Sequence, residues 1–352
     1  MSLFEQPAKR ILIVLHGSIG DVTRALPLAN LIRRGFPEAF LSWAVEPACF
    51  PLVEYYPAVN EIILFDRRRG WRDFVPFLKR IRSRRFDLVL DLQRHLKSGV
   101  ISFFSGAPDR IGFHRSDCKE LNWIFNNAHI PAVGDQVSKL EHYLKFAEYL
   151  GVETSPVEWF FRLTADEELG VDKHLAQVGR AYAALFVGSR WVSKQWFPAQ
   201  IADCARAIQR RHSFDVVLLG SKQDEKAAAE AQAQCGAGVT NLVGQTSLRE
   251  AIGIISRAKV AIGPDTGLMH ISAAVGTPVV SLWGATTPSR NAPYGFGQLA
   301  IRGRADCSPC NAKTCPIDRL CMKSIETAEV ADKVALALSL DSKTPGSYAT
   351  RS

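Results

Sequence analysis

Short apolar runs alternate with longer helical patterns along almost the whole chain, and this alternation constrains the fold more than any other feature of the sequence. Eight runs have strand length and are near-continuously apolar: 11–15, 41–45, 61–65, 87–91, 184–187, 215–219, 259–262 and 279–283. The helical patterns lie at 21–34, 71–84, 95–105, 138–150, 198–211, 224–235, 247–257, 267–275 and 326–339. Strands of this kind are typical of parallel sheets covered by helices on both faces. The sequence therefore predicts an α/β architecture built from βαβ units.

The length of 352 residues suits two such domains, since a soluble domain typically has ~100–200 residues. The series is interrupted after the helix at 138–150 by GVETSPVEWFF, which contains Gly151 and Pro156. We predict an N-terminal Rossmann-like domain over 1–157, a C-terminal Rossmann-like domain with a closing helix over 158–340, and a flexible tail over 341–352. Two doubly wound domains in tandem are expected to face a central cleft at the carboxyl ends of their strands.

A net charge of +8 favours an anionic partner. Much of the excess lies between residues 67 and 85, where nine cations accompany one acid, Asp73. The cations are Arg67, Arg68, Arg69, Arg72, Lys79, Arg80, Arg82, Arg84 and Arg85. Aromatic and aliphatic residues recur among them at helical spacing, which predicts a basic amphipathic helix that faces an anionic surface. A solvated helix face on a basic protein explains the same pattern equally well.

The chain carries no sign of a membrane span or of export. No apolar run approaches the ~20 residues that span a bilayer, and the N-terminus lacks the long apolar core of a secretion signal. We therefore expect a cytoplasmic protein. Because no nucleic-acid-binding module accompanies the basic segment, nucleic acid is not the expected partner.

The first strand leads through a tight turn into a helix in ILIVLHGSIGDVTRALPL, residues 11–28. The turn holds Gly17 and Gly20, but it is neither a dinucleotide fingerprint nor a Walker loop. Asp21 is predicted to cap the helix, where the helix dipole favours a carboxylate. At the end of a parallel strand the same carboxylate is also placed to take a proton from a bound hydroxyl. Glycine at position 20 lets a substrate approach the backbone closely.

Two segments of the second half gather polar residues at strand ends. VGSRWVSKQWFP (187–198) brings Ser189, Arg190 and Lys194 into one loop, which suits phosphate binding, although a solvated loop is the simpler alternative. In GPDTGLMHISAAVGTPVVSLWGATTP (263–288), a strand is followed by a turn and a helix of small residues. The N–H groups at the start of that helix favour an anion. The side chains grouped there are Asp265, Thr266 and His270, beside Gly267.

Together these segments resemble the family 9 glycosyltransferases, the ADP-heptose:lipopolysaccharide heptosyltransferases of Gram-negative bacteria. The resemblance covers about residues 10 to 335. DLQRHLKSGVIS (91–102) and LNWIFNNAHI (121–130) look closer to heptosyltransferase I, which adds the first heptose to Kdo on lipid A. The resemblance implies a GT-B fold and an inverting transfer that needs no metal and no cofactor. It also implies an ADP-heptose donor and a Kdo–lipid A acceptor.

The resemblance further assigns roles to single residues. Asp21 matches the general base, and the donor contacts match Ser189, Lys194, Asp265, Thr266, Gly267 and His270. We expect the acceptor, which is bound mainly by the first domain, to contact Gly20, Arg67, Arg68, Arg69, Lys97 and Arg110. The basic segment would then face the phosphorylated acceptor at the cytoplasmic surface of the inner membrane. We expect the enzyme to be a monomer that is peripheral to this membrane.

Four of the eight cysteines cluster in CSPCNAKTCPIDRLC, at Cys307, Cys310, Cys315 and Cys321. The C-x2-C spacing is also found in zinc and iron–sulfur sites, but we expect reduced thiols and no bound metal. Other functions remain open at this point. The chain could be heptosyltransferase II or another family 9 transferase with a different donor or acceptor. Outside enzymes, it could be a protein that binds nucleotides or anionic glycans.

Overall fold

The computed structural model describes residues 8–340 and 347–348. The chain divides into two compact units, residues 1–161 and 162–352, where the sequence predicted a boundary after residue 157. The intervening residues stay with the first unit because Trp159 Nε1 donates to the Thr23 carbonyl at 2.7 Å, and Asn30 Nδ2 donates to the Glu158 carbonyl at 2.8 Å. Most of the predicted flexible tail, 341–352, lies outside the described residues.

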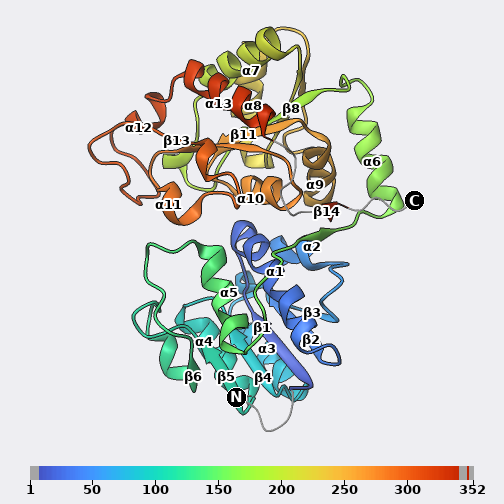
Figure 1. The fold of residues 1–352 in the computed structure, drawn as a ribbon, viewed down its shortest axis with the longest axis vertical. Coiled ribbons are helices and arrows are strands. Elements are labelled where there is room, and N and C mark those ends of the chain that lie inside the picture. The colour runs from blue at the N-terminus through green and yellow to red at the C-terminus, as the bar shows by residue number, and fades with distance from the viewer. Residues whose placement is uncertain (1–7, 341–346, 349–352) are drawn as a thin grey trace. The chain divides into compact units, whose positions relative to one another are not determined.

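The first unit is built on a parallel six-stranded sheet with strand order β3-β2-β1-β4-β5-β6. The strands are β1 (Arg10–Val14), β2 (Phe40–Val45), β3 (Glu61–Leu64), β4 (Leu88–Asp91), β5 (Asp109–Gly112) and β6 (Ala128–His129). The helices are α1 (Ile19–Gly35), α2 (Phe50–Val53), α3 (Trp71–Ser83), α4 (Leu96–Ser105) and α5 (Lys139–Tyr149). Short 3-10 turns are η1 (Pro47–Cys49), η2 (Arg67–Arg69) and η3 (Asn122–Phe125), and the unit ends with β7 (Phe160–Phe161). Helices line both faces of the sheet (Figure 1).

The second unit repeats this plan, with strand order β10-β9-β8-β11-β12-β13 and all strands parallel. The strands are β8 (Tyr182–Phe186), β9 (Asp215–Leu219), β10 (Val239–Asn241), β11 (Val260–Pro264), β12 (Val279–Trp283) and β13 (Ala300–Arg302). The helices are α6 (Ala165–Leu175), α7 (Pro198–His212), α8 (Glu225–Ala233), α9 (Leu248–Arg257), α10 (Gly267–Ala274), α11 (Pro288–Asn291), α12 (Leu320–Lys323) and α13 (Thr327–Ser339). Short elements are η4 (Val192–Lys194), η5 (Lys222–Asp224), η6 (Gly297–Leu299) and β14 (Ser347–Tyr348).

Each sheet reverses its winding direction between two central strands, β1 and β4 in the first unit and β8 and β11 in the second. In open α/β sheets, ligands bind beyond the carboxyl ends of the strands at such a switch point. The loops that matter for function are therefore those that follow β1, β4, β8 and β11. All the residues of β8 and β11 are buried, so these loops rise from rigid strands.

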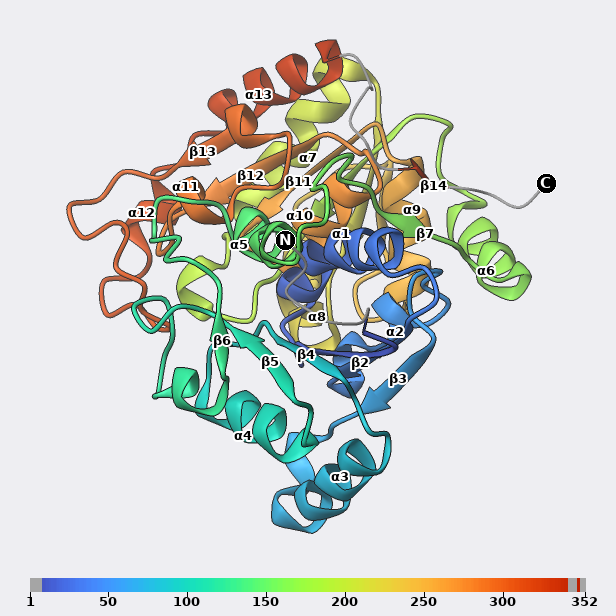
Figure 2. The same ribbon diagram turned by 60° about the horizontal axis from the view of Figure 1, so that its bottom comes forward.

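The basic helix α3 lies at the outer edge of the first unit, beside α4 (Figure 2). Its apolar face does not look outward. Phe74, Phe77 and Ile81 are buried in one core cluster with Leu12 of β1 and Ile63 of β3. The predicted basic amphipathic helix is present, but its aromatic face packs on the sheet and is not free to meet a membrane. Within the described part of the chain, no helix is long and apolar enough to cross a bilayer.

Candidate functional site

Asp21 lies in the first turn of α1, which follows β1 after the loop 15–18. The prediction that Asp21 is the N-cap of this helix is wrong in position, because the helix starts two residues earlier and Ser18 is the N-cap. Asp21 instead faces back toward the cap, where its Oδ2 accepts from Ser18 Oγ at 3.0 Å and from Ser18 N at 3.3 Å. This is the geometry of a capping box, in which the third helical residue closes the helix end.

Two cations hold the other oxygen of Asp21. Oδ1 accepts from Arg24 Nη2 at 2.7 Å and from Lys139 Nζ of α5 at 3.1 Å. Burial alone raises the pKa of this carboxyl, but the charges of Lys139 and Arg24 outweigh it and hold the pKa well below its usual range. Asp21 is thus ionised at any physiological pH, and while both cations hold it the carboxylate is a weak base. Sequence reasoning missed Lys139, which is brought in by tertiary packing from 118 residues away.

His16 lies two residues after the end of β1, in the loop that leads to α1. It is buried, its ring is 4.8 Å from that of Phe65, and its Nε2 has no hydrogen-bond partner among the described residues. Burial, reinforced by the charges of Lys97 and Arg67, lowers the pKa of His16 to about 3. The structure therefore brings two of the predicted acceptor cations, Lys97 and Arg67, close to a neutral histidine. Its position after a fully apolar strand was the sequence signal for His16.

The other predicted acceptor residues are spread more widely. Arg68 and Arg69 are largely exposed and pair with Asp66 at 3.0 and 3.8 Å. Gly20 is buried within the first turn of α1. Arg110 stands apart: it pairs with Val89 near the amino end of β4, and its guanidinium donates to the carbonyls of Ala107 and Phe125.

In the second unit, Lys194 and Asp265 form an ion pair of 2.6 Å that is mostly buried. Lys194 follows β8 in η4, and Asp265 directly follows β11. Thr286 Oγ1 donates to the same carboxylate oxygen at 2.8 Å, and the Lys194 ammonium also lies 4.2 Å from the centre of the Trp191 ring. An ammonium has three N–H donors, so Lys194 is able to hold Asp265 and a phosphate oxygen at once.

Ser189 joins the loops that follow β8 and β11, because its hydroxyl donates to the Asp265 carbonyl at 2.8 Å. Beside it, the buried Asp224 accepts from Ser221 Oγ at 2.7 Å and lies against Gly188. A Cβ at position 188 would be 1.8 Å from Asp224 Oδ1, so only glycine fits there. No role for Asp224 is predicted from the sequence.

Helix α10 begins next to this ion pair. Its cap residue Thr266 is extended and makes no side-chain cap hydrogen bond, and Gly267 is the first helical residue. The first N–H groups of the helix are therefore not closed by Thr266 and favour an anion. His270 is buried one turn further along the helix. The structure thus gathers Ser189, Lys194 and the predicted 265–270 motif at one switch point.

The cysteine-rich segment supports the Lys194 loop. Ser193 Oγ donates to the Ala312 carbonyl at 2.5 Å, and Arg319 Nη1 donates to the Gln195 carbonyl at 3.2 Å. The four thiols are free, and burial raises the pKa of Cys321. Among the residues that the structure describes, no group of three or more His, Cys, Asp or Glu side chains is arranged to hold a metal ion.

Comparisons with known proteins show the family of this chain. The family model described as glycosyltransferase family 9 (heptosyltransferase) matches residues 75–321. The lipopolysaccharide core heptosyltransferase OpsX of Haemophilus influenzae is 28% identical over 298 residues, which cover 84% of each chain. Lipopolysaccharide heptosyltransferase 1 of Pseudomonas aeruginosa is 27% identical over 320 residues, which cover 87% of each chain.

A solved structure shares the fold. The chain is similar to the Escherichia coli heptosyltransferase WaaC with ADP, with a TM-score of 0.74 at 20% identity, over 93% of this chain and 99% of the other. This likeness, together with two parallel six-stranded sheets of the same strand order, confirms the predicted GT-B fold class.

Proposed function

Since this chain belongs to glycosyltransferase family 9, we propose that it transfers L-glycero-D-manno-heptose from ADP-heptose to Kdo of the lipid A–Kdo inner core, with inversion at the anomeric carbon. The observation that carries the proposal is the group formed by Lys194, Asp265 and the start of α10, which suits a sugar diphosphate. The names of the H. influenzae and P. aeruginosa relatives support the lipopolysaccharide acceptor.

In this proposal Asp21 is the general base. Its ionised carboxylate takes the proton of an acceptor hydroxyl while the hydroxyl oxygen forms a bond to the anomeric carbon of the donor. The bond from that carbon to the ADP phosphate oxygen breaks on the opposite face, which inverts the configuration. A carboxylate held by Arg24 and Lys139 is a weak base, so we expect the acceptor to displace Lys139 before the proton moves.

The second unit stabilises the leaving group. ADP departs with an additional negative charge on its terminal phosphate, and the Lys194 ammonium together with the N–H groups at the start of α10 faces that charge. Asp265 and Ser189 act as positioning residues, since they fix Lys194 and the loop around it. A cation and a helix N-terminus thus take the place that other sugar transferases give to a divalent metal.

The acceptor is anionic, and the cations of the first unit are suited to it. Lys97 and Arg67 lie near the buried His16. Arg68 and Arg69 extend this positive region into solvent. We infer that these residues hold Kdo–lipid A at the cytoplasmic surface of the inner membrane, where the protein is peripheral.

The test is a comparison of acceptors. ADP release from ADP-heptose is measured with Kdo–lipid A and with the same acceptor that already carries one heptose. We expect turnover with the first and little with the second. The reverse preference would assign the chain to a later heptose addition, and no turnover with either would point to a different acceptor or donor.

A further inference from the structure

Two segments that resembled heptosyltransferase I, 91–102 and 121–130, are not used in the mechanism above. In the fold they contain most of α4 and the whole of η3, which pack against each other. Buried polar contacts fix this pair: Asn122 Nδ2 donates to Asp91 Oδ2 at 2.7 Å, and Ser102 Oγ donates to Asn126 Oδ1 at 2.7 Å. A Cβ at Gly99 would lie 2.8 Å from the Phe125 ring, so this glycine permits the close approach. The surface that the pair presents is therefore rigid.

That surface is apolar. Six of the sixteen exposed large apolar side chains among the described residues belong to it. They are Leu96, Phe103, Phe104, Leu121, Trp123 and Ile124, and we call them the α4–η3 surface. Phe103 lies 5.5 Å from Phe104 and 6.2 Å from Phe125, measured between ring centres, so the rings of the helix and of the turn form one patch. Clustered exposed apolar side chains on a folded unit mark an interaction surface.

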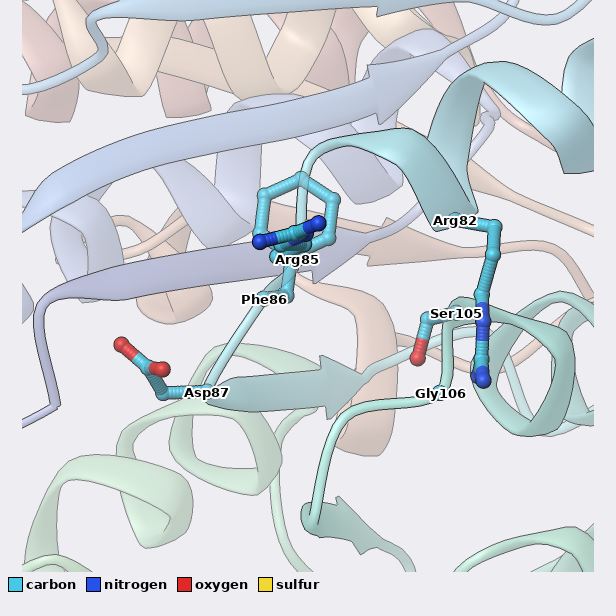
Figure 3. Close-up of a pocket in the computed structure, with 6 residues that line it drawn as sticks. All are labelled: Arg82, Arg85, Phe86, Asp87, Ser105 and Gly106. Carbon is cyan, nitrogen blue, oxygen red and sulfur yellow. The ribbon is translucent and has the colours of Figure 1, made fainter.

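Cations border this surface at the C-terminal end of α4. The Arg110 guanidinium lies 5.8 Å from the centre of the Phe103 ring. Beside the end of α4 is a pocket of about 430 Å³, lined by Arg82, Arg85, Phe86, Asp87, Ser105 and Gly106 (Figure 3). The carboxylate that lines the pocket already has hydrogen-bond donors, since Asp87 Oδ2 accepts from the backbone N–H groups of Lys9 and Arg10.

The two arginines of the pocket have no polar partner. Within the described parts of the chain, neither the Arg82 nor the Arg85 guanidinium forms an ion pair or a hydrogen bond. Figure 3 shows Arg82 beside Ser105 and Gly106, with Arg85 further along the same pocket. Guanidinium groups bind phosphate oxygens with two parallel N–H donors. The pocket therefore has the chemistry to hold a phosphate group.

We propose that the α4–η3 surface inserts into an anionic lipid bilayer while Arg82 and Arg85 bind a lipid phosphate. An apolar surface bordered by cations is the arrangement that binds the interface of anionic membranes. A second copy of the chain fits less well, because a symmetric contact would bring the unpaired arginines of both copies together. Only the biological purpose of this membrane contact rests on the proposed function: the contact would bring the first unit to a lipid-anchored acceptor.

The first experiment measures binding of the full-length protein to vesicles of phosphatidylcholine containing one-quarter phosphatidylglycerol. The variant Phe103→Ser/Phe104→Ser removes two half-exposed rings, and we expect about 10- to 100-fold weaker partitioning. The matched control is Leu169→Ser/Leu336→Ser, which removes two exposed apolar side chains from α6 and α13 and should bind like the wild type. Equal melting temperatures would establish that both variants fold.

Two further measurements separate insertion from simple charge attraction. Arg82→Gln/Arg85→Gln should weaken binding to these anionic vesicles at least about fivefold, and should leave the weaker binding to pure phosphatidylcholine unchanged. Brominated acyl chains should quench part of the tryptophan fluorescence of the wild type, and Trp123→Phe should remove that part. Trp123 is the tryptophan on the α4–η3 surface, so this readout reports its depth.

The outcomes are distinct. Unchanged vesicle binding of Phe103→Ser/Phe104→Ser overturns the proposal, as does a change from dimer to monomer in that variant without loss of vesicle binding. The proposal is supported if Phe103→Ser/Phe104→Ser loses vesicle binding but keeps its turnover on a water-soluble acceptor that has been stripped of its acyl chains. If the wild type turns over no acceptor at all, the proposed function fails, while the vesicle measurements still decide whether this surface binds lipid.

Discussion

Replacement of Asp21 by Asn tests the proposed general base and has two separate consequences. The first is structural. Arg24 and Lys139 contact the same oxygen, at 2.7 and 3.1 Å, so their nitrogens lie within about 6 Å of each other. Without the carboxylate charge these cations repel each other by about 3 kcal/mol at an effective dielectric constant of ~20. Lys139 is one-third exposed, so screening and movement reduce the cost to about 1–2 kcal/mol of unfolding free energy.

The second consequence is catalytic. An amide cannot take the acceptor proton, and general-base contributions are typically ~10²–10⁴-fold, so kcat should fall by about that factor. The KM for ADP-heptose should change little, because the donor contacts that we propose belong to the second unit. Denaturant unfolding and steady-state kinetics on the same preparations measure both effects.

A double variant separates the two consequences. Asp21→Asn/Lys139→Met removes the repulsion between the cations and should recover most of the lost stability, but it should recover no turnover. Lys139→Met alone leaves Asp21 paired with Arg24 and should stay within about tenfold of the wild-type kcat. The reasoning is refuted if Asp21→Asn keeps kcat within about threefold of the wild type, or if the double variant regains turnover together with stability.

Three other predictions concern the donor, the acceptor and pH. Lys194→Met should raise the KM for ADP-heptose and lower kcat, because it removes the cation that we propose faces the diphosphate. Turnover of the wild type should be unaffected by EDTA, and a loss of turnover that added Mg²⁺ restores would contradict this. Changing Arg67, Arg68 and Arg69 to Gln should raise the KM for the lipid acceptor and flatten its salt dependence, with the donor KM constant as the control. The pKa of His16 is lowered to about 3 in the folded protein, so the unfolded chain binds the proton first as pH falls below 6.5. The free energy of unfolding should therefore decline below pH 6.5 by up to about 1.4 kcal/mol per pH unit. His16→Gln should flatten this slope in denaturant titrations.

The central strands could be predicted from sequence because they are apolar on both faces. β9 and β12 have the predicted bounds, and most of the other predicted elements differ by one or two residues. The short strands β5, β6, β10 and β13, which lie at or next to the sheet edges, were missed. They have two to four residues and are only partly buried, so the sequence carries no continuous apolar run that would mark them.

The grouping of Lys194 with Asp265 could be predicted because both residues are close in sequence to the ends of buried strands. The parallel sheet brings these strand ends side by side, and Lys194 Nζ lies 2.6 Å from Asp265 Oδ2. Contacts made through packing left no such signal. Lys139 reaches Asp21 from another helix, and Asp224 lies against Gly188 from another loop. The prediction that the apolar face of the basic segment meets an anionic surface was wrong, because this face packs on the sheet. Spacing alone does not distinguish an apolar face that packs on a sheet from one that meets a membrane.

The most direct measurement of the central claim is the mass and anomeric configuration of the product. The protein is incubated with ADP-heptose and Kdo–lipid A, and the lipid is analysed by mass spectrometry and NMR. We predict a lipid heavier by one heptose residue, joined with the anomeric configuration opposite to that of the donor, and no product from Asp21→Asn on the same timescale. An unmodified lipid, or a product that retains the donor configuration, would contradict the proposed inverting transfer.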